Sequence, residues 1–351
     1  MTVKELKEIT KVNVPIKGIF VISKCELKPF AAKGGYFMQC QLTDLTGSIK
    51  GIVWDGAEAI KLWIKNKMVV ETAGDITRYN DMPQVIVKTL KQKTDYNPAD
   101  FLPSLPPNKI LTAVCSLNEY GNSIKDTICL KLWKAIIPVP RSDGYDYPSS
   151  ISEKFIQCPG GVGEVHHNYL GGLLEHSYGM IKAAITLSEY SGLDKDILLT
   201  GCLLHDIGKI DSYAWDVVLE MTDHGRLLHH TTIGYEILMG LIEDHEIFYG
   251  PISANKTLLK LAHIIIAHHE DEGLRKPMFP EAQAVSALDS MDAAVQHAMM
   301  FSNKSENQEQ DSNWTTFCRL TERQYYMPKK VQEAIQEPEK KKPKVEMESM
   351  F

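Results

Sequence analysis

The sequence lacks several features that mark other classes of protein. Its seven cysteines stand singly, and no CxxC pair suggests a zinc or redox motif. No apolar run approaches the length of a bilayer span, and the first thirty residues carry mixed lysine and glutamate without the apolar core of a signal peptide. Internal repeats are also absent. These absences exclude membrane and disulfide-stabilised secreted classes and predict a cytoplasmic globular protein with reduced cysteines.

Charge is distributed unevenly along the 351 residues. Residues 1–100 hold 15 Lys and Arg against 11 Asp and Glu, a balance of +4, and because the whole chain carries −7 the remainder carries −11. A basic first part joined to an acidic body fits a nucleic-acid-binding part joined to a metal-binding catalytic part. Chance scatter of surface charge gives the same totals, so charge alone leaves both interpretations open.

Residues 1–93 have the pattern of a small all-β domain. Five short strands are predicted, at residues 16–22, 36–42, 49–54, 68–76 and 83–90. One helix is predicted between the third and the fourth strand, over residues 57–64. This is the order of an OB-fold barrel. Such barrels bind single strands through basic grooves and stacked aromatics, for which Phe37, Trp54, Trp63 and Tyr79 are candidates. The alternative is that these aromatics pack in the core and the barrel contacts partner proteins.

The rest of the chain divides by composition. Proline-rich residues 94–110 predict a linker, and helical periodicity extends over residues 111–302. Residues 303–351, which include a Lys340–Lys342 run, predict a mostly flexible tail. The predicted fold class is therefore multi-domain, with an N-terminal all-β OB-fold barrel followed by an all-α domain.

All twelve histidines lie between His166 and His297, inside the predicted helical domain. The apolar run 198–204 ends in His205 and Asp206. A carboxylate at the end of a buried helix is costly unless it is paired, and a divalent cation is an economical partner. These residues therefore predict half of a metal site.

Helical spacing brings further ligands to buried faces. His268 and His269 extend the apolar face of residues 258–265, and Asp289 and Asp292 share one face of the last helix. Imidazoles and carboxylates without thiolates suit iron, manganese, cobalt or zinc better than magnesium or calcium. Six or more such groups exceed what one tetrahedral ion needs, so two metals bridged by a carboxylate are predicted. Any one histidine taken alone is more often an ordinary core or surface residue.

The order His176, His205-Asp206, Asp289 matches the H…HD…D signature of the HD-domain metallophosphohydrolases. Adding His230 and the pair at 268–269 resembles their two-metal members. The residues after this pair lack the GYP tripeptide of the cyclic-di-GMP phosphodiesterases.

Over roughly residues 12–300 the chain most resembles bacterial 3′-to-5′ exoribonucleases of the YhaM type, which join an OB fold to an HD domain. The matching stretches are 166–176, 204–209, 225–230, 280–282 and 288–293. His229 stands where a small residue is expected, and the tail beyond about Asn303 has no match.

The resemblance implies a ligand set and a reaction. One metal, with manganese favoured over iron, cobalt or zinc, would be held by His176, His205, Asp206 and Asp289, and the second by Asp206, His230, His268 and His269. Hydroxide activated by the two metals would attack the terminal linkage and release nucleoside 5′-monophosphates. Lys209 would contact the phosphate, although a solvated helix end is its alternative. Asp292 would orient a neighbour or act as a general base, and His166 and His167 would contact substrate or support the ligands.

The favoured function is thus a metal-dependent 3′-to-5′ exonuclease on single-stranded RNA, with single-stranded DNA as a further candidate substrate. One rival is a nucleotide phosphohydrolase or cyclic-nucleotide phosphodiesterase, which has no evident use for an OB barrel. The other is a single-strand-binding protein whose HD domain is only structural. A homo-oligomer is left open, and no membrane partner is predicted.

Overall fold

The computed structural model describes residues 1–31, 34–163, 165–269, 276–310 and 312–328. It comprises two units, Met1–Ser286 and Ala287–Phe351, each of which is described by itself. The Lys340–Lys342 run of the tail lies outside the described residues. Among the described helices, none has the length and hydropathy needed to span a membrane.

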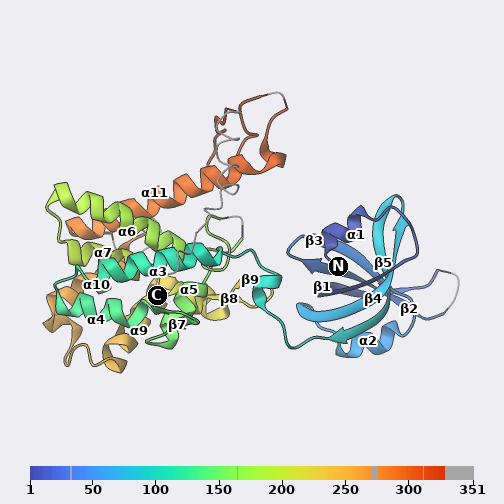
Figure 1. The fold of residues 1–351 in the computed structure, drawn as a ribbon, viewed down its shortest axis with the longest axis horizontal. Coiled ribbons are helices and arrows are strands. Elements are labelled where there is room, and N and C mark those ends of the chain that lie inside the picture. Colours follow the sequence, from blue (N-terminus) through green and yellow to red (C-terminus); the bar gives the residue numbers. More distant parts are fainter. Residues whose placement is uncertain (32–33, 164, 270–275, 311, 329–351) are drawn as a thin grey trace, which may run out of the picture. The chain divides into compact units, whose positions relative to one another are not determined.

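Five strands close a barrel in the order β1-β2-β3-β5-β4 (Figure 1), which confirms the predicted OB fold. The elements of this part are α1 (Val3–Glu8), β1 (Val14–Pro29), β2 (Tyr36–Asp44), β3 (Gly47–Val53), α2 (Ala57–Trp63), β4 (Met68–Tyr79) and β5 (Met82–Gln92). All neighbours are antiparallel except β3 and β5, whose parallel pairing of Lys50 with Gln84 closes the barrel. Alternating apolar residues of each strand fill its interior.

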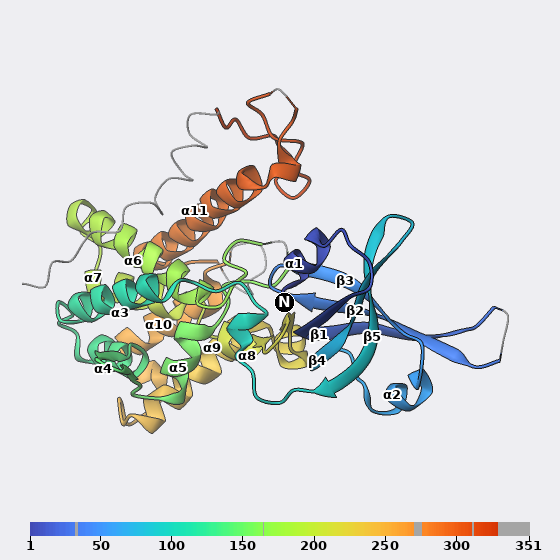
Figure 2. The same ribbon diagram turned by 45° about the vertical axis from the view of Figure 1, so that its right-hand side comes forward.

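Strand β1 is longer than the predicted 16–22 because it serves two neighbours. Its first part, Val14–Ile22, pairs with β4, and its second part, Val21–Pro29, pairs with β2. The register shifts between Ser23 and Glu26, and a β-bulge of this kind bends a strand. The bend lets one strand close the barrel, and the paired ends of β1 and β2 then extend from its body (Figure 2).

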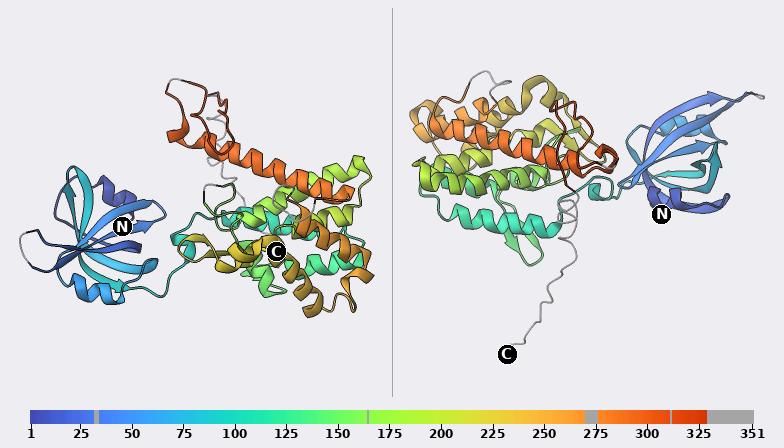
Figure 3. Two further views of the ribbon diagram at one scale, coloured as in Figure 1. Left: turned by 180° about the vertical axis from the view of Figure 1, so that it is seen from behind. Right: turned by 90° about the horizontal axis from the view of Figure 1, so that it is seen from above.

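The second part of the first unit is mainly helical, as predicted (Figure 3). Its elements are η1 (Pro98–Asp100), α3 (Pro107–Gly121), α4 (Thr127–Ile136), β6 (Val139–Arg141), β7 (Gly144–Asp146), α5 (Ser150–Gln157), α6 (Gly172–Ser191), α7 (Lys195–Leu204), α8 (Lys209–Ser212), β8 (Tyr213–Trp215), β9 (Leu219–Met221), α9 (Asp223–Asp244), η2 (Ile252–Ala254) and α10 (Lys256–Ala267). Helix α3 begins inside the predicted linker, because proline is well tolerated in the first turn of a helix.

Helix α7 explains the apolar run that ends at His205. Asp194 caps its N-terminus by accepting hydrogen bonds from the backbone N–H groups of Asp196 and Ile197. Every residue from Ile197 to Leu204 is buried, so the helix is surrounded by protein and its C-terminal end lies in the interior. Residues that follow α7 are therefore delivered to a buried place.

Helix α11 (Pro280–Asn303) begins in the first unit and continues into the second. In the second unit, η3 (Ser305–Asn307) follows, and isolated β-bridges join Gln308 to Thr315 and Trp314 to Tyr326. Residues 329–351 of the predicted flexible tail lie outside the described residues. The division into residues 1–93, 94–110, 111–302 and 303–351 stays a prediction.

Candidate metal centre

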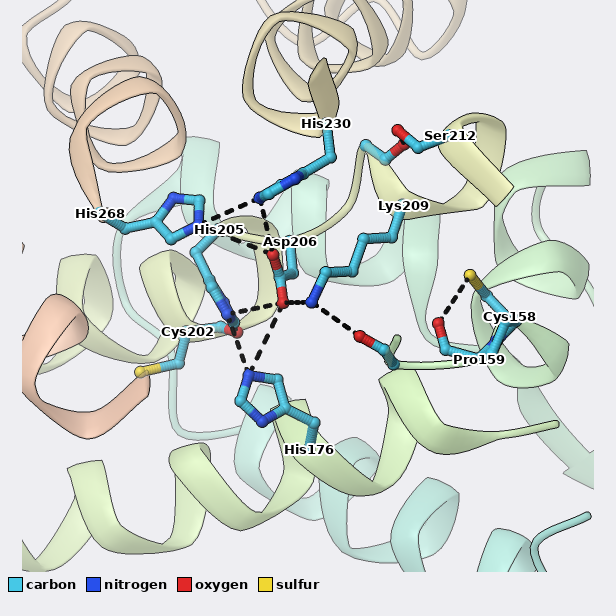
Figure 4. Close-up of polar contacts among 12 residues, drawn as sticks. Cys158, Pro159, His176, Cys202, His205, Asp206, Lys209, Ser212, His230 and His268 are labelled. Carbon is cyan, nitrogen blue, oxygen red and sulfur yellow. Dashed lines mark hydrogen bonds and ion pairs between the residues drawn. The ribbon is translucent and has the colours of Figure 1, made fainter. Parts of the chain in front are cut away.

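Side chains from four helical segments converge on the carboxylate of Asp206 (Figure 4). His176 comes from α6, His205 caps the C-terminus of α7, His230 comes from α9 and His268 follows α10. The five side chains belong to residues that are at most 8% exposed. The structure thus brings together residues that are up to 92 positions apart in the sequence.

Asp206 presents one oxygen to each of two groups of histidines. Its Oδ2 lies 3.3 Å from His205 Nε2 and 3.7 Å from His176 Nε2. Its Oδ1 lies 3.2 Å from His230 Nε2 and 3.6 Å from His268 Nε2. We call His176, His205 and Asp206 the first set. The second set is Asp206, His230, His268 and His269, whose ligand atoms all lie within 4.8 Å of one another.

Hydrogen bonds outside the site orient two of the imidazoles. The Nδ1 atoms of His205 and His268 lie 2.9 Å and 3.0 Å from the carbonyl oxygens of Cys202 and Ile265. A carbonyl only accepts, so each Nδ1 donates to it and each Nε2 faces Asp206. Histidines that hold metals in proteins are oriented by second hydrogen bonds of this kind.

One oxygen of the Asp206 carboxylate lacks a hydrogen-bond donor in the described part of the chain. Asp206 Oδ1 is buried and accepts no hydrogen bond from the residues that the structure describes. A buried, unsatisfied carboxylate oxygen is costly, and a divalent cation would remove that cost. Imidazole nitrogens with a shared carboxylate are a donor set suited to divalent transition metals. The residues present therefore fit the predicted metals.

Lys209 is part of the site rather than a solvated helix end, which corrects that alternative. It begins α8, yet its Nζ turns back to lie 2.5 Å from Asp206 Oδ2 and donates to the Gly160 carbonyl at 2.8 Å. Burial alone would raise the pKa of Asp206, but the charges of Lys209 and His205 outweigh it and hold this pKa well below its usual range. The Asp206 carboxylate is therefore ionised.

Burial has the opposite effect on the charge of His230. It lowers the pKa of this imidazole from 6.5 to about 3, against the attraction of Asp206. The ring is thus neutral near pH 7. A neutral imidazole is the form that binds metals, so His230 needs no proton loss to act as a ligand.

The lowered pKa of His230 predicts acid sensitivity of the metal-free protein. Because the unfolded chain takes up this proton below pH 6.5 and the folded chain only near pH 3, stability is full above pH 6.5 and falls as the pH decreases between these values. One such proton changes the free energy of unfolding by about 1.4 kcal/mol per pH unit. Thermal melts from pH 7 to pH 4 should show a shallower pH dependence for His230→Gln than for wild type. Equal slopes would contradict the prediction.

The predicted substrate contacts His166 and His167 lie beside the first set. Their ring centroids are 5.9 Å and 5.5 Å from that of His176. Nδ1 of the buried His167 lies 2.8 Å from the hydroxyl of Tyr169, which donates to the carboxylate of Glu175. This supporting contact was not singled out from the sequence, although Tyr169 and Glu175 lie within the stretch that carries the resemblance.

Asp289 and Asp292 lie on α11 beyond Ser286, in the second unit. Their assignment as a metal ligand and as a catalytic residue therefore stays a prediction from the sequence. His269, half-buried, follows His268 and belongs to the second set.

Two of the four aromatic residues predicted to stack on bases come together on the barrel. The ring centroids of Phe37 and Trp54 are 4.9 Å apart, and Phe30 stacks on Trp54 at 6.0 Å with an interplanar angle of 18°. Trp54 is 42% exposed, and Trp63 is the last residue of α2. Phe30 was missed because it directly follows β1, a strand that was predicted to end at residue 22.

Tyr79 lies elsewhere on the barrel. It is 65% exposed at the end of β4, and the register places it near Ser48 and Lys50 in the first half of β3, whereas Trp54 follows the end of that strand. The candidate stacking surface therefore consists of Phe30, Phe37 and Trp54, and Tyr79 does not join it.

Comparison with known proteins first gives the class. Residues 173–294 match the model of the HD domain. This segment contains every residue of the first and second sets. The predicted HD domain is thus confirmed, and it follows the OB barrel in the chain.

Comparison with curated proteins then gives particular relatives. The chain is 25% identical over 284 residues to the 3′-5′ exoribonuclease YhaM of Listeria welshimeri, covering 79% of this chain and 85% of the relative. It is 24% identical over 285 residues to the Bacillus subtilis protein of the same name, covering 79% and 84%. The predicted resemblance to YhaM-type exoribonucleases is confirmed.

Among solved structures, asparaginyl-tRNA synthetase from Pyrococcus horikoshii matches 45% of this chain and 44% of its own, with 13% identity and a TM-score of 0.20. We draw no conclusion from that match.

Proposed function

We propose that this chain is a metal-dependent 3′-to-5′ exonuclease that hydrolyses single-stranded RNA to nucleoside 5′-monophosphates. The predicted class of enzyme, a hydrolytic nuclease, is supported by the HD domain and by the names of the relatives. The observation that carries the proposal is the carboxylate of Asp206, which faces two groups of imidazoles in one buried site. The OB barrel favours a polymeric substrate over a free nucleotide.

Two divalent ions, with manganese favoured over iron, cobalt or zinc, are the proposed cofactors. The first set with Asp289 would hold one, and the second set would hold the other. When bound, such ions supply Lewis acidity, which makes water a nucleophile near neutral pH and offsets the charge of the phosphodiester.

The chain's own residues would orient the reactants. Lys209, held between Asp206 and the Gly160 carbonyl, adds a positive charge where the phosphate would approach. His166 and His167 would contact the substrate beside the first set, and Asp292 would orient water or accept its proton. Attack of water on the terminal phosphorus, with the 3′ oxygen of the preceding nucleotide leaving, releases a 5′-monophosphate.

A degradation time course tests this proposal. 5′-labelled single-stranded RNA and a matched DNA would be incubated with manganese and then with chelator. The expected result is a metal-dependent ladder of RNA products that shortens from the 3′ end. Comparison with the DNA of the same sequence shows whether cleavage requires ribose. RNA that is bound but intact would favour the single-strand-binding alternative. Hydrolysis of free or cyclic nucleotides alone would favour the phosphohydrolase or phosphodiesterase. A cytoplasmic location and a homo-oligomer stay predictions.

Substitution of Trp54 should weaken RNA binding by the barrel. One base stacked on an aromatic side chain contributes about 1–3 kcal/mol, so Trp54→Ala should raise the dissociation constant for single-stranded RNA roughly 5- to 150-fold. Tyr79→Ala is the matched control, because Tyr79 is more exposed but lies apart from the stacking surface. Fluorescence anisotropy with a chelator present measures binding without cleavage. An equal loss in both variants would show that stacking is not confined to this surface.

A further inference from the structure

His229 has backbone angles that do not occur in helices, although it lies inside α9. Its φ of 64° and ψ of 149° divide Asp223–Asp244 into two helical segments. Glycine adopts positive φ without steric cost, whereas the Cβ of histidine makes it unfavourable. Non-glycine residues persist in such conformations only where their surroundings impose them, and they cluster at ligand sites.

The break in α9 lies next to a backbone contact that helps to position the second set. A Cβ on Gly208 would lie 1.9 Å from the His230 carbonyl oxygen and 2.5 Å from the Gly234 nitrogen, so the two backbones touch there. Because Gly208 comes two residues after Asp206, this contact helps to place His230 Nε2 3.2 Å from Asp206 Oδ1. Glycine at position 229 would adopt the backbone angles of the break with less strain than histidine. The break alone therefore does not explain why the side chain at this position is an imidazole.

The imidazole of His229 lies on the accessible side of the second set. Its ring centroid is 4.2 Å from that of His230 and 6.4 Å from that of His269, and its Nδ1 lies 3.2 Å from Thr231 Oγ1. His229 and His269 are half-buried, whereas the other three members of the second set are buried. A substrate that reaches the second set from solvent would therefore meet His229 and His269 first.

We propose that His229 is a substrate-binding residue that contacts the terminal nucleotide of the strand beside the second set. This inference rests on the proposed exonuclease function. The second set holds four ligands without His229, so that set does not need His229 as a ligand. An imidazole can donate a hydrogen bond to a phosphate oxygen, and its face can stack on a base. Strain at position 229 is then retained because the side chain improves substrate binding.

Two substitutions separate the ring from the strain. His229→Gly removes both, and His229→Ala removes the ring but keeps a Cβ at positive φ. Both should raise the KM for RNA about 10- to 100-fold, the effect of losing one hydrogen bond to a charged group. The melting temperature should rise by roughly 2–4 °C in His229→Gly and not in His229→Ala. Manganese content should match wild type in both variants, and hydrolysis of bis(p-nitrophenyl) phosphate, which contains no nucleotide, should fall less than hydrolysis of RNA.

Other outcomes would overturn the inference. A wild-type KM for RNA in His229→Gly would show that the ring contacts no substrate. Loss of manganese, or an equal loss of RNA and bis(p-nitrophenyl) phosphate hydrolysis, would assign His229 to the metal site. If wild type itself does not cleave RNA, the proposed function and this inference both fail, whereas an active wild type with an unchanged His229→Gly variant removes only the inference.

Discussion

Asp206→Asn is expected to reduce RNA cleavage by at least about a thousandfold. The substitution removes the negative charge that faces both histidine groups at 3.2–3.7 Å, and an amide offers only one acceptor oxygen where the carboxylate offers two. Both metals would lose their shared ligand. Product formation under single-turnover conditions, with manganese in excess, measures the loss.

The same substitution leaves the ammonium of Lys209 buried without its partner, which costs about 3–5 kcal/mol of stability. The double variant Asp206→Asn/Lys209→Met removes both charges and should recover much of the melting temperature without recovering activity. Asp211→Asn is the matched control, because Asp211 makes a half-exposed ion pair with Lys154 at 2.6 Å. That control should cleave RNA within about twofold of wild type. A similar loss in the control would mean that the assay reports general damage.

Gly208→Ala is expected to destabilise the protein and displace His230. The added methyl group would meet backbone atoms 1.9 Å and 2.5 Å away, and backbone cannot rotate aside as a side chain can. Helices α8 and α9 must then separate, at a cost of about 3 kcal/mol, which lowers the melting temperature by at least roughly 5 °C. Since His230 Nε2 would move away from Asp206 Oδ1, RNA cleavage should also fall by at least about tenfold.

Gly240→Ala in α9 is the matched control for Gly208→Ala. A Cβ at Gly240 meets nothing within 4 Å, so alanine should stabilise α9 by up to about 1 kcal/mol through its higher helix propensity. Differential scanning calorimetry of the two variants should give shifts of opposite sign. Equal shifts would show that close contact between Gly208 and His230 does not exist in solution.

Much of the fold and site is predictable because local periodicity dictates it. The period of the apolar residues in α10 carries His268 onto a buried face, and the apolar run of α7 delivers His205 and Asp206 to the interior. The strand order of the barrel follows from short β-rich stretches separated by turns. These features need only near neighbours in the sequence.

Features set by contacts between distant segments are not predictable in this way. The bulge near Lys24 that lengthens β1 depends on two partner strands, and Phe30 therefore escaped notice. The turn of Lys209 toward Asp206 involves the Gly160 carbonyl, and the break at His229 lies beside the contact between Gly208 and His230. In each case the contacting residue is distant in the sequence, and the residues near the position do not indicate which one it is.

Metal stoichiometry tests the central claim most directly. Metal-free protein would be reconstituted with manganese, passed over a desalting column and analysed by inductively coupled plasma mass spectrometry beside His230→Gln and Asp206→Asn. The account predicts about two manganese ions per chain in wild type, about one in His230→Gln and less than one in Asp206→Asn. One ion or fewer in wild type, or two in Asp206→Asn, would contradict a two-metal centre bridged by this carboxylate.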